Sequence, residues 1–170
     1  MQRISALLSV VVFGCFTSNA RSDEPGRPLD DNFLIKISSC VHAEIELDKL
    51  ADKRASSPKV KEFAADLVKD HQKCFENLAQ ATKYRKISVV TGFEKDAQAE
   101  MDRLSKLEGA HFDREFIACV IKSHKDGIAM FEAQANDGKN AEIRKFANDT
   151  LPTLREHLKR ALEVSKTVNP

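Results

Sequence analysis

The stretch that decides the fold is VKEFAADLVKDHQKCFENL, residues 60–78, in which apolar side chains recur every three or four positions. This spacing predicts an amphipathic helix with one face in a core. The residues of the inward stripe are Val60, Phe63, Ala64, Leu67, His71, Cys74 and Leu78. An imidazole and a thiol therefore lie on a face that otherwise serves packing.

The start of this stretch recurs later in the chain. VKEFAAD at residues 60–66 matches IRKFAND at residues 143–149. His42 precedes the phenylalanine of the first copy by 21 positions, and His124 precedes that of the second copy by 22. We infer a duplicated helical hairpin, and chance similarity between two amphipathic helices is the alternative reading.

The remaining elements are also helical. Ser57 can cap a new helix, and Pro58 suits its first position because no intrahelical partner is needed there. Apolar periodicity predicts five helices, whose inward residues extend over 33–51, 60–78, 93–107, 116–131 and 143–161, with candidate caps of the first helix at Asp30 and Asp31. No segment shows sustained strand alternation, so we predict an all-α four-helix bundle. Its two hairpins are joined by a crossover connection that contains the short extra helix.

Composition limits the classes of function. The 170 residues suit one domain, and 27 Lys and Arg balance 26 Asp and Glu. With no basic excess to neutralise phosphates, nucleic acid is not expected as a partner.

The N-terminus predicts export. Residues 1–20 have a positive start, a short apolar run and small residues before Ala20, as in a signal peptide. An alternative is lipoprotein processing, in which Cys15 within VFGC would be lipidated and anchor the chain to a membrane. A flexible tether at 21–29 and a bundle domain at 30–168 would follow.

The sequence resembles a family of exported bacterial proteins described as ferritin-like, or as predicted outer-membrane proteins, with a domain of unknown function. The matching stretches are AEIELDKLADKRASSPKVKEFAADLVKDH (43–71), GAHFDREFIACVIKSHKDGIAMFE (109–132) and FANDTLPTLREHL (146–158). The resemblance implies a ferritin-like four-helix bundle in the periplasm or cell envelope, and it implies no activity. This chain departs from the usual pattern, which has Gly where Asp48 stands and Asp where Ser123 stands.

Three polar residues are predicted to meet at the centre of the bundle. Glu44 and His71 lie about 13 and 14 residues on either side of the first turn, so they are level at 1.5 Å per residue. His124 lies at a similar distance before the second turn. One carboxylate and two imidazoles can hold iron or zinc. The alternative is a buried polar network without metal, in which Glu44 neutralises the histidines.

Other candidate sites carry fewer ligands. His157 is expected off-centre by more than a helical turn, near Cys119, where two ligands are too few to select a metal. Asp70 is expected to face solvent or a partner helix. Cys40 and Cys74 lie level on inward stripes, and an exported chain permits a disulfide between them.

The expected function is a non-enzymatic structural, interaction or binding module of the envelope, with other envelope proteins as candidate partners. The alternative is a metal-binding bundle that uses the core histidines and Glu44. A nucleophilic Cys74 beside His71 would make an enzyme, but the sequence offers no oxyanion hole or orienting third group.

Overall fold

The computed structural model describes residues 29–83, 87–88 and 91–168. Its helices are α1 (Leu29–Arg54), α2 (Pro58–Thr82), α3 (Lys95–Leu104), α4 (Gly109–Asp137) and α5 (Ala141–Val168). Within these residues there is no strand, which confirms the all-α class. The expected signal peptide, Cys15 and nearly all of the tether lie outside the described residues.

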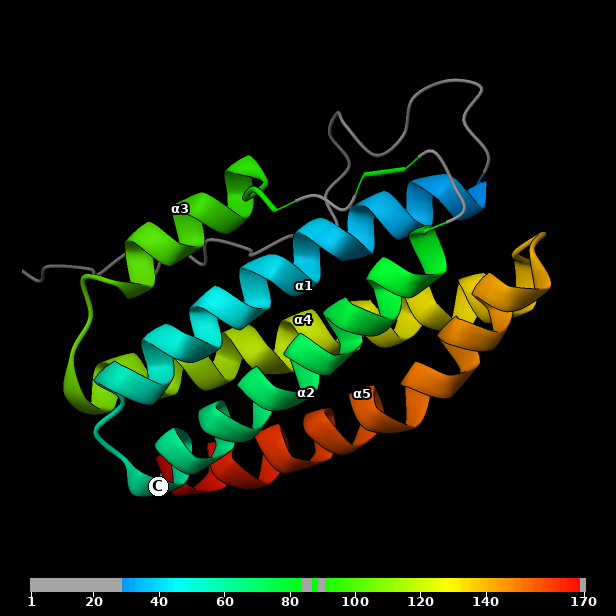
Figure 1. Cartoon of the computed structure of the whole chain (residues 1–170). Helices are drawn as coiled ribbons and strands as arrows, with labels where there is room; N and C mark the ends of the chain where they lie inside the picture. The colour runs from blue at the N-terminus through cyan, green and yellow to red at the C-terminus, as the bar shows by residue number, and fades with distance from the viewer. Residues whose placement is uncertain (1–28, 84–86, 89–90, 169–170) are drawn as a thin grey trace, which may run out of the picture.

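The four long helices form a bundle of two hairpins (Figure 1). Helix α1 pairs with α2, α4 pairs with α5, and the hairpins meet through α1 with α4 and α2 with α5. The connection between the hairpins carries α3, which lies outside the bundle against α1 and α4 (Figure 1). The helical bundle with a short crossover helix is therefore confirmed. No helix in the described part of the chain combines the length and apolarity needed to cross a bilayer.

Local signals explain most helix ends. Pro58 begins α2 as expected, although the Ser57 side chain makes no capping hydrogen bond. Gly109, expected after the short helix, opens α4 with a φ of 59°, a conformation that glycine adopts without strain. At the end of α4, a Cβ on Gly138 would lie 2.5 Å from the backbone oxygen of Gln134, so the turn needs glycine. Pro152 lies inside α5, and this helix is bent along its length in Figure 1.

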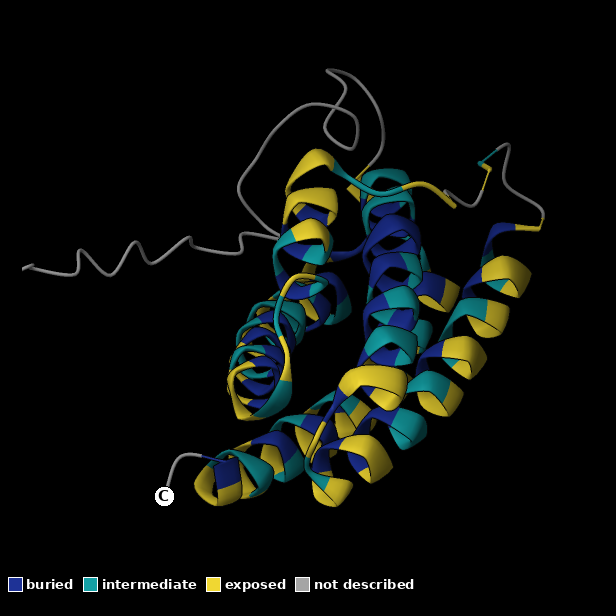
Figure 2. Cartoon of the chain, turned by 90° about the vertical axis from the view of Figure 1, so that its left-hand side faces the viewer, coloured by how far each residue is buried: buried dark blue, intermediate teal, exposed yellow. Residues whose placement is uncertain are grey.

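The buried faces of the helices point inward and the exposed faces outward (Figure 2). They form two apolar clusters, one around Phe63, Phe112 and Phe116 and the other around Phe33 and Phe131. On helices α2, α4 and α5, the residues His71, His124 and His157 each lie between the part of the helix that joins one apolar cluster and the part that joins the other. The polar centre of the bundle therefore has close-packed hydrocarbon at both ends.

Each hairpin turn is held by an aspartate from the other hairpin. Asp113 of α4 accepts hydrogen bonds from the backbone nitrogens of Ser56 and Ser57 at 2.9 and 2.8 Å. The Ser56 hydroxyl donates to the same carboxylate at 2.5 Å. Both oxygens of the side chain are therefore used to order the α1–α2 turn.

The other turn is held in the same way. Asp30 of α1 accepts from the backbone nitrogens of Lys139 and Asn140 at 3.1 and 2.8 Å, and from the Gln134 amide at 2.6 Å. We call Asp30 and Asp113 the turn aspartates. Both are buried. Their reciprocal arrangement agrees with the duplicated hairpin inferred from the sequence.

Candidate metal centre

Three buried histidines meet at the centre of the bundle. His71 of α2, His124 of α4 and His157 of α5 each offer a ring nitrogen within 4.8 Å of the others. Their exposed fractions are 4, 2 and 2%. The structure brings His71 and His124 together, as the sequence predicts. It also brings His157 into the cluster, so the prediction of an off-centre His157 is wrong.

The direction of helical side chains explains the error. Counting residues from a turn gives the height of the Cα atom, whereas a helical side chain leans toward the N-terminus of its helix. Because α4 and α5 are antiparallel, His124 and His157 lean toward each other along the bundle axis. His157 therefore reaches the cluster from a Cα that lies farther from the turn.

Each imidazole is held through one nitrogen by a hydrogen-bond acceptor. His71 Nδ1 lies 2.7 Å from Asp48 Oδ2, and His157 Nε2 lies 2.9 Å from Asp70 Oδ2. His124 Nδ1 lies 2.9 Å from the carbonyl oxygen of Val120. A carboxylate or carbonyl oxygen only accepts, so the hydrogen of each ring lies on the nitrogen that faces it. The other nitrogen of each neutral ring then presents a lone pair.

These lone pairs converge. His124 Nε2 and His157 Nδ1 are 3.2 Å apart, and both are acceptors in the tautomers that their partners select. His71 Nε2 is buried and has no hydrogen-bond partner. Outer acceptors that fix the tautomer and orientation of ligating histidines are a regular feature of metal sites.

The electrostatic surroundings distinguish the three rings. Burial lowers the pKa of His124 to about 4, although Glu44 opposes the shift. Burial also lowers the pKa of His157 against the opposing hydrogen bond to Asp70. Burial would lower the pKa of His71 too, but Glu44, Asp48 and Asp70 outweigh it and raise the pKa to about 9. Near neutral pH the cluster therefore holds one imidazolium and two neutral imidazoles.

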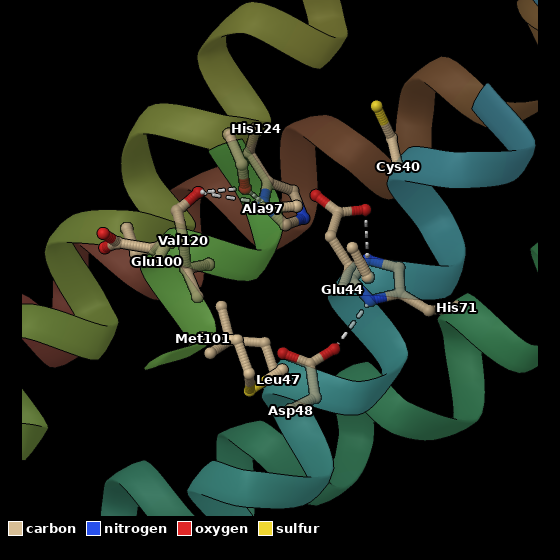
Figure 3. Close-up of a pocket in the computed structure, with 13 residues that line it drawn as sticks. Cys40, Glu44, Leu47, Asp48, His71, Ala97, Glu100, Met101, Val120 and His124 are labelled. Atoms are coloured by element: carbon tan, nitrogen blue, oxygen red, sulfur yellow. Dashed lines mark hydrogen bonds and ion pairs between the residues drawn. The ribbon is translucent and has the colours of Figure 1, made fainter. Parts of the chain in front are cut away.

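Two acidic groups of α1 face His71 in Figure 3. Glu44 Oε2 lies 3.8 Å from His71 Nε2, too far for a hydrogen bond but close enough for an ion pair. Asp48 holds the opposite nitrogen, and its burial raises its pKa to about 6 even though His71 favours the charged form. Glu44 is thus the candidate fourth ligand, and Asp48 orients the ring.

Two cavities adjoin the cluster. The first lies beneath α3, is drawn in Figure 3, and has a volume of about 20 Å³; Glu44, His71, Ala97 and His124 are among its lining residues. The second, of about 40 Å³, is lined by all three histidines. One water needs roughly 10–15 Å³, so both can hold a water or a small ligand beside the cluster.

The cysteines surround this centre. All three in the described residues are thiols, and Cys40 and Cys74 line the second cavity together. The disulfide between them stays a prediction for the oxidised protein. Cys119 lines the first cavity, and His157 lines the second.

Sequence reasoning missed the roles of two carboxylates. Asp48 lies four residues after Glu44 on α1, and this spacing could have placed both on the His71 side. Asp70 does face a partner helix, as one of the expected alternatives had it, but nothing in the sequence identified His157 as its partner. The hydroxyl oxygen of Ser123 lies 3.4 Å from His124 Nδ1, and the hydroxyl donates a hydrogen bond to the carbonyl oxygen of Val120.

Comparison with known proteins places the chain among proteins of unknown function. Residues 16–164 match the family described as "Domain of unknown function (DUF4142)". No curated protein matches the sequence.

Solved structures share the fold at low sequence identity. A DUF305 fragment from Deinococcus radiodurans has 17% identity and a TM-score of 0.72, with 85% of this chain and 99% of that chain covered. A DUF305 protein from Streptomyces coelicolor, named as a secreted protein, has 13% identity and a TM-score of 0.68, with 82 and 93% covered. CopM in the Cu(II)-bound form has 19% identity and a TM-score of 0.69, with 81 and 96% covered. At these identities the likeness shows the fold alone.

Proposed function

This chain belongs to the DUF4142 family, and from its histidine cluster we propose that it is a metal-binding module for a late first-row transition ion. His71, His124 and His157 are the ligands, and Glu44 is the fourth. When bound, the ion supplies a positive charge that attracts the lone pairs of the histidine nitrogens, which otherwise repel one another.

The contact between His124 Nε2 and His157 Nδ1 carries the proposal. Two acceptors 3.2 Å apart repel unless a proton or a cation lies between them. Burial lowers the pKa of both His124 and His157, and it therefore disfavours a shared proton between their two nitrogens. A metal ion satisfies both nitrogens at once and adds the unpartnered nitrogen of His71.

The spacing of the nitrogens suits one ion. Two imidazole nitrogens bound at about 2.0–2.1 Å lie at most about 4.2 Å apart. The pair at 3.2 Å already meets this limit, and the cluster as a whole, within 4.8 Å, meets it after small ring movements.

Copper and zinc fit the donor set best. Imidazole suits both, as it suits iron, and Cu²⁺ binds most tightly in the divalent series. That CopM was solved with Cu(II) and with Cu(I) on the same fold supports copper here. Iron, which the sequence indicated together with zinc, remains the alternative metal.

The setting of this module is also part of the proposal. The N-terminal pattern and the neighbour named as a secreted protein support export to the periplasm or envelope. The crossover between the hairpins supports a ferritin-like arrangement. Lipidation of Cys15 would add a membrane anchor.

Titration of the metal-free protein tests the function. We expect one Cu²⁺ or Zn²⁺ per chain in the wild type and loss of that tight site in His157→Ala, measured by calorimetry and by elemental analysis after gel filtration. His157 is the informative position because the sequence pattern of Glu44, His71 and His124 does not require it.

The control is His111→Ala, since His111 is exposed on α4 and lies outside the cluster. It should keep the full stoichiometry. Equal binding by His157→Ala and the wild type would disprove the three-histidine site. If the wild type binds no metal, the non-enzymatic interaction module that the sequence predicts becomes the favoured function.

A further inference from the structure

The three histidines are almost fully buried, so an incoming ion needs a path through the packed helices. Protein interiors are too dense for an ion to pass between side chains without an opening. A groove on the outer surface, between α2 and α5, provides this opening. Its volume is about 530 Å³, and we call it the α2–α5 groove.

The groove and the second cavity share their wall. Asp70, Cys74, Thr150 and Thr153 line both. These four residues form the neck between solvent and the histidine cluster. Past the neck, His71, whose Nε2 atom has no hydrogen-bond partner, is among the residues that line the cavity.

Asp70 connects the two sides of the neck. Its side chain is 47% exposed, while Oδ2 accepts a hydrogen bond from His157 at 2.9 Å. The groove also contains Glu142 and Asp149, with Lys73 and Lys145 as the opposing charges. Lys145 is paired with Asp149, which limits its repulsion of a cation.

Cys74 supplies the second donor at the neck. Aligning VKEFAAD with IRKFAND places Cys74 of the first hairpin at the position of His157 in the second. Both residues accordingly line the second cavity, one from α2 and one from α5. Burial and then the charge of Glu44 raise the pKa of the Cys74 thiol to about 12. A protonated thiol holds an ion weakly, which suits transient binding rather than storage.

On the opposite side of the cluster, helix α3 lies over the first cavity. The buried Glu100 of this helix is bound by Arg103 at 2.6 and 2.8 Å. An ion arriving from that side would have to pass α3, where it packs against α1 and α4.

We propose that the α2–α5 groove is the loading site for the metal, where the Asp70 carboxylate and the Cys74 thiol hold the incoming ion before it passes to His157, His124 and His71. The inference rests on the proposed function. The ion is a soft or borderline transition-metal cation, since a thiol and an imidazole both favour that class.

Stopped-flow loading of the reduced, metal-free protein tests this route, with Zn²⁺ as the probe and a chromophoric chelator as the reporter. Thr153→Phe narrows the neck at an exposed position, and Cys74→Ser removes the soft donor with little change in size. Both variants should load several-fold more slowly than the wild type and reach the same final stoichiometry.

Two controls separate the route from general effects. Thr167→Phe adds the same bulk to α5 away from the groove, and Ala97→Val reduces the cavity beneath α3. Both should load at the wild-type rate. Wild-type rates in Thr153→Phe and Cys74→Ser at full stoichiometry would overturn the loading site while leaving the metal centre intact. Slow loading of Ala97→Val alone would place the route beneath α3. Failure of the wild type to bind either Zn²⁺ or Cu²⁺ at equilibrium would refute the metal centre, and the loading site with it; if Cu²⁺ alone binds, it replaces Zn²⁺ as the probe.

Discussion

At the scale of single residues, His71 couples metal binding to protons. Its pKa of about 9 means that an ion must displace a proton from this ring near neutral pH, whereas His124 and His157 are already neutral. As the pH rises toward 9, fewer molecules carry that proton, so binding becomes tighter. We expect the apparent affinity to rise about tenfold per pH unit between pH 7 and 9 and then to level off.

Calorimetry in buffers of different ionisation enthalpy measures this exchange. About one proton should leave per ion bound at pH 7. In Asp48→Asn, the loss of one of the charges that raise the pKa of His71 should reduce the proton release at pH 8. Binding without proton release in the wild type would show that His71 is neutral or is not a ligand.

The sequence could identify two of the three histidines because height along a helix follows from residue counting. It could not identify His157, because the lean of antiparallel side chains acts in opposite directions on α4 and α5. The side of α1 on which Asp48 lies follows from its four-residue spacing to Glu44, whereas the role of Asp70 depends on the rotation of α2 about its axis, which periodicity specifies only for the apolar stripe.

At the scale of elements, α3 depends on one ion-pair network. Arg103 binds both oxygens of the buried Glu100 and reaches Glu115 of α4 at 2.8 Å. Arg103→Ala leaves the Glu100 carboxylate buried without this partner. We expect it to lower the free energy of unfolding by about 1–3 kcal/mol, and to speed hydrogen exchange in α3 more than in α1.

A matched control is Lys145→Ala, which breaks an ion pair whose side chains are 73 and 62% exposed. An exposed pair contributes about 0–1 kcal/mol, so the change in urea unfolding should be small. Equal effects of the two substitutions would mean that Arg103 does not hold α3 in place.

The helices themselves were largely predictable, with errors at their ends. Helix α1 begins at Leu29, before the first apolar residue of its stripe at Phe33, because Asp30 is bound to the other hairpin. Helix α5 continues beyond Ala161, the last residue of its predicted inward stripe, to Val168, which is buried. Long-range contacts thus set boundaries that local periodicity does not encode.

At the scale of the whole molecule, the turn aspartates join the hairpins. Asp113→Ala removes three hydrogen bonds from the α1–α2 turn and leaves two backbone donors unsatisfied. We expect it to lower the free energy of unfolding by on the order of 3 kcal/mol in urea titrations. Asp30→Ala should have a comparable effect at the opposite end.

Asp52→Ala provides the comparison, since this aspartate is exposed on α1 near the same turn. Surface substitutions of this kind usually change stability by less than about 0.5 kcal/mol. If Asp113→Ala were no more destabilising than Asp52→Ala, the hairpins would be held together by their apolar faces alone.

The turn aspartates also order events during synthesis. The amides of Ser56 and Ser57 leave the ribosome 57 and 56 residues before the Asp113 carboxylate that completes their turn. Asp30 is separated further from its partners, since the Lys139 amide that donates to it lies 109 positions later in the chain. A nascent chain that contains only the first hairpin therefore lacks the hydrogen bonds that Asp113 accepts from its turn, and these form only after the start of the second hairpin has emerged.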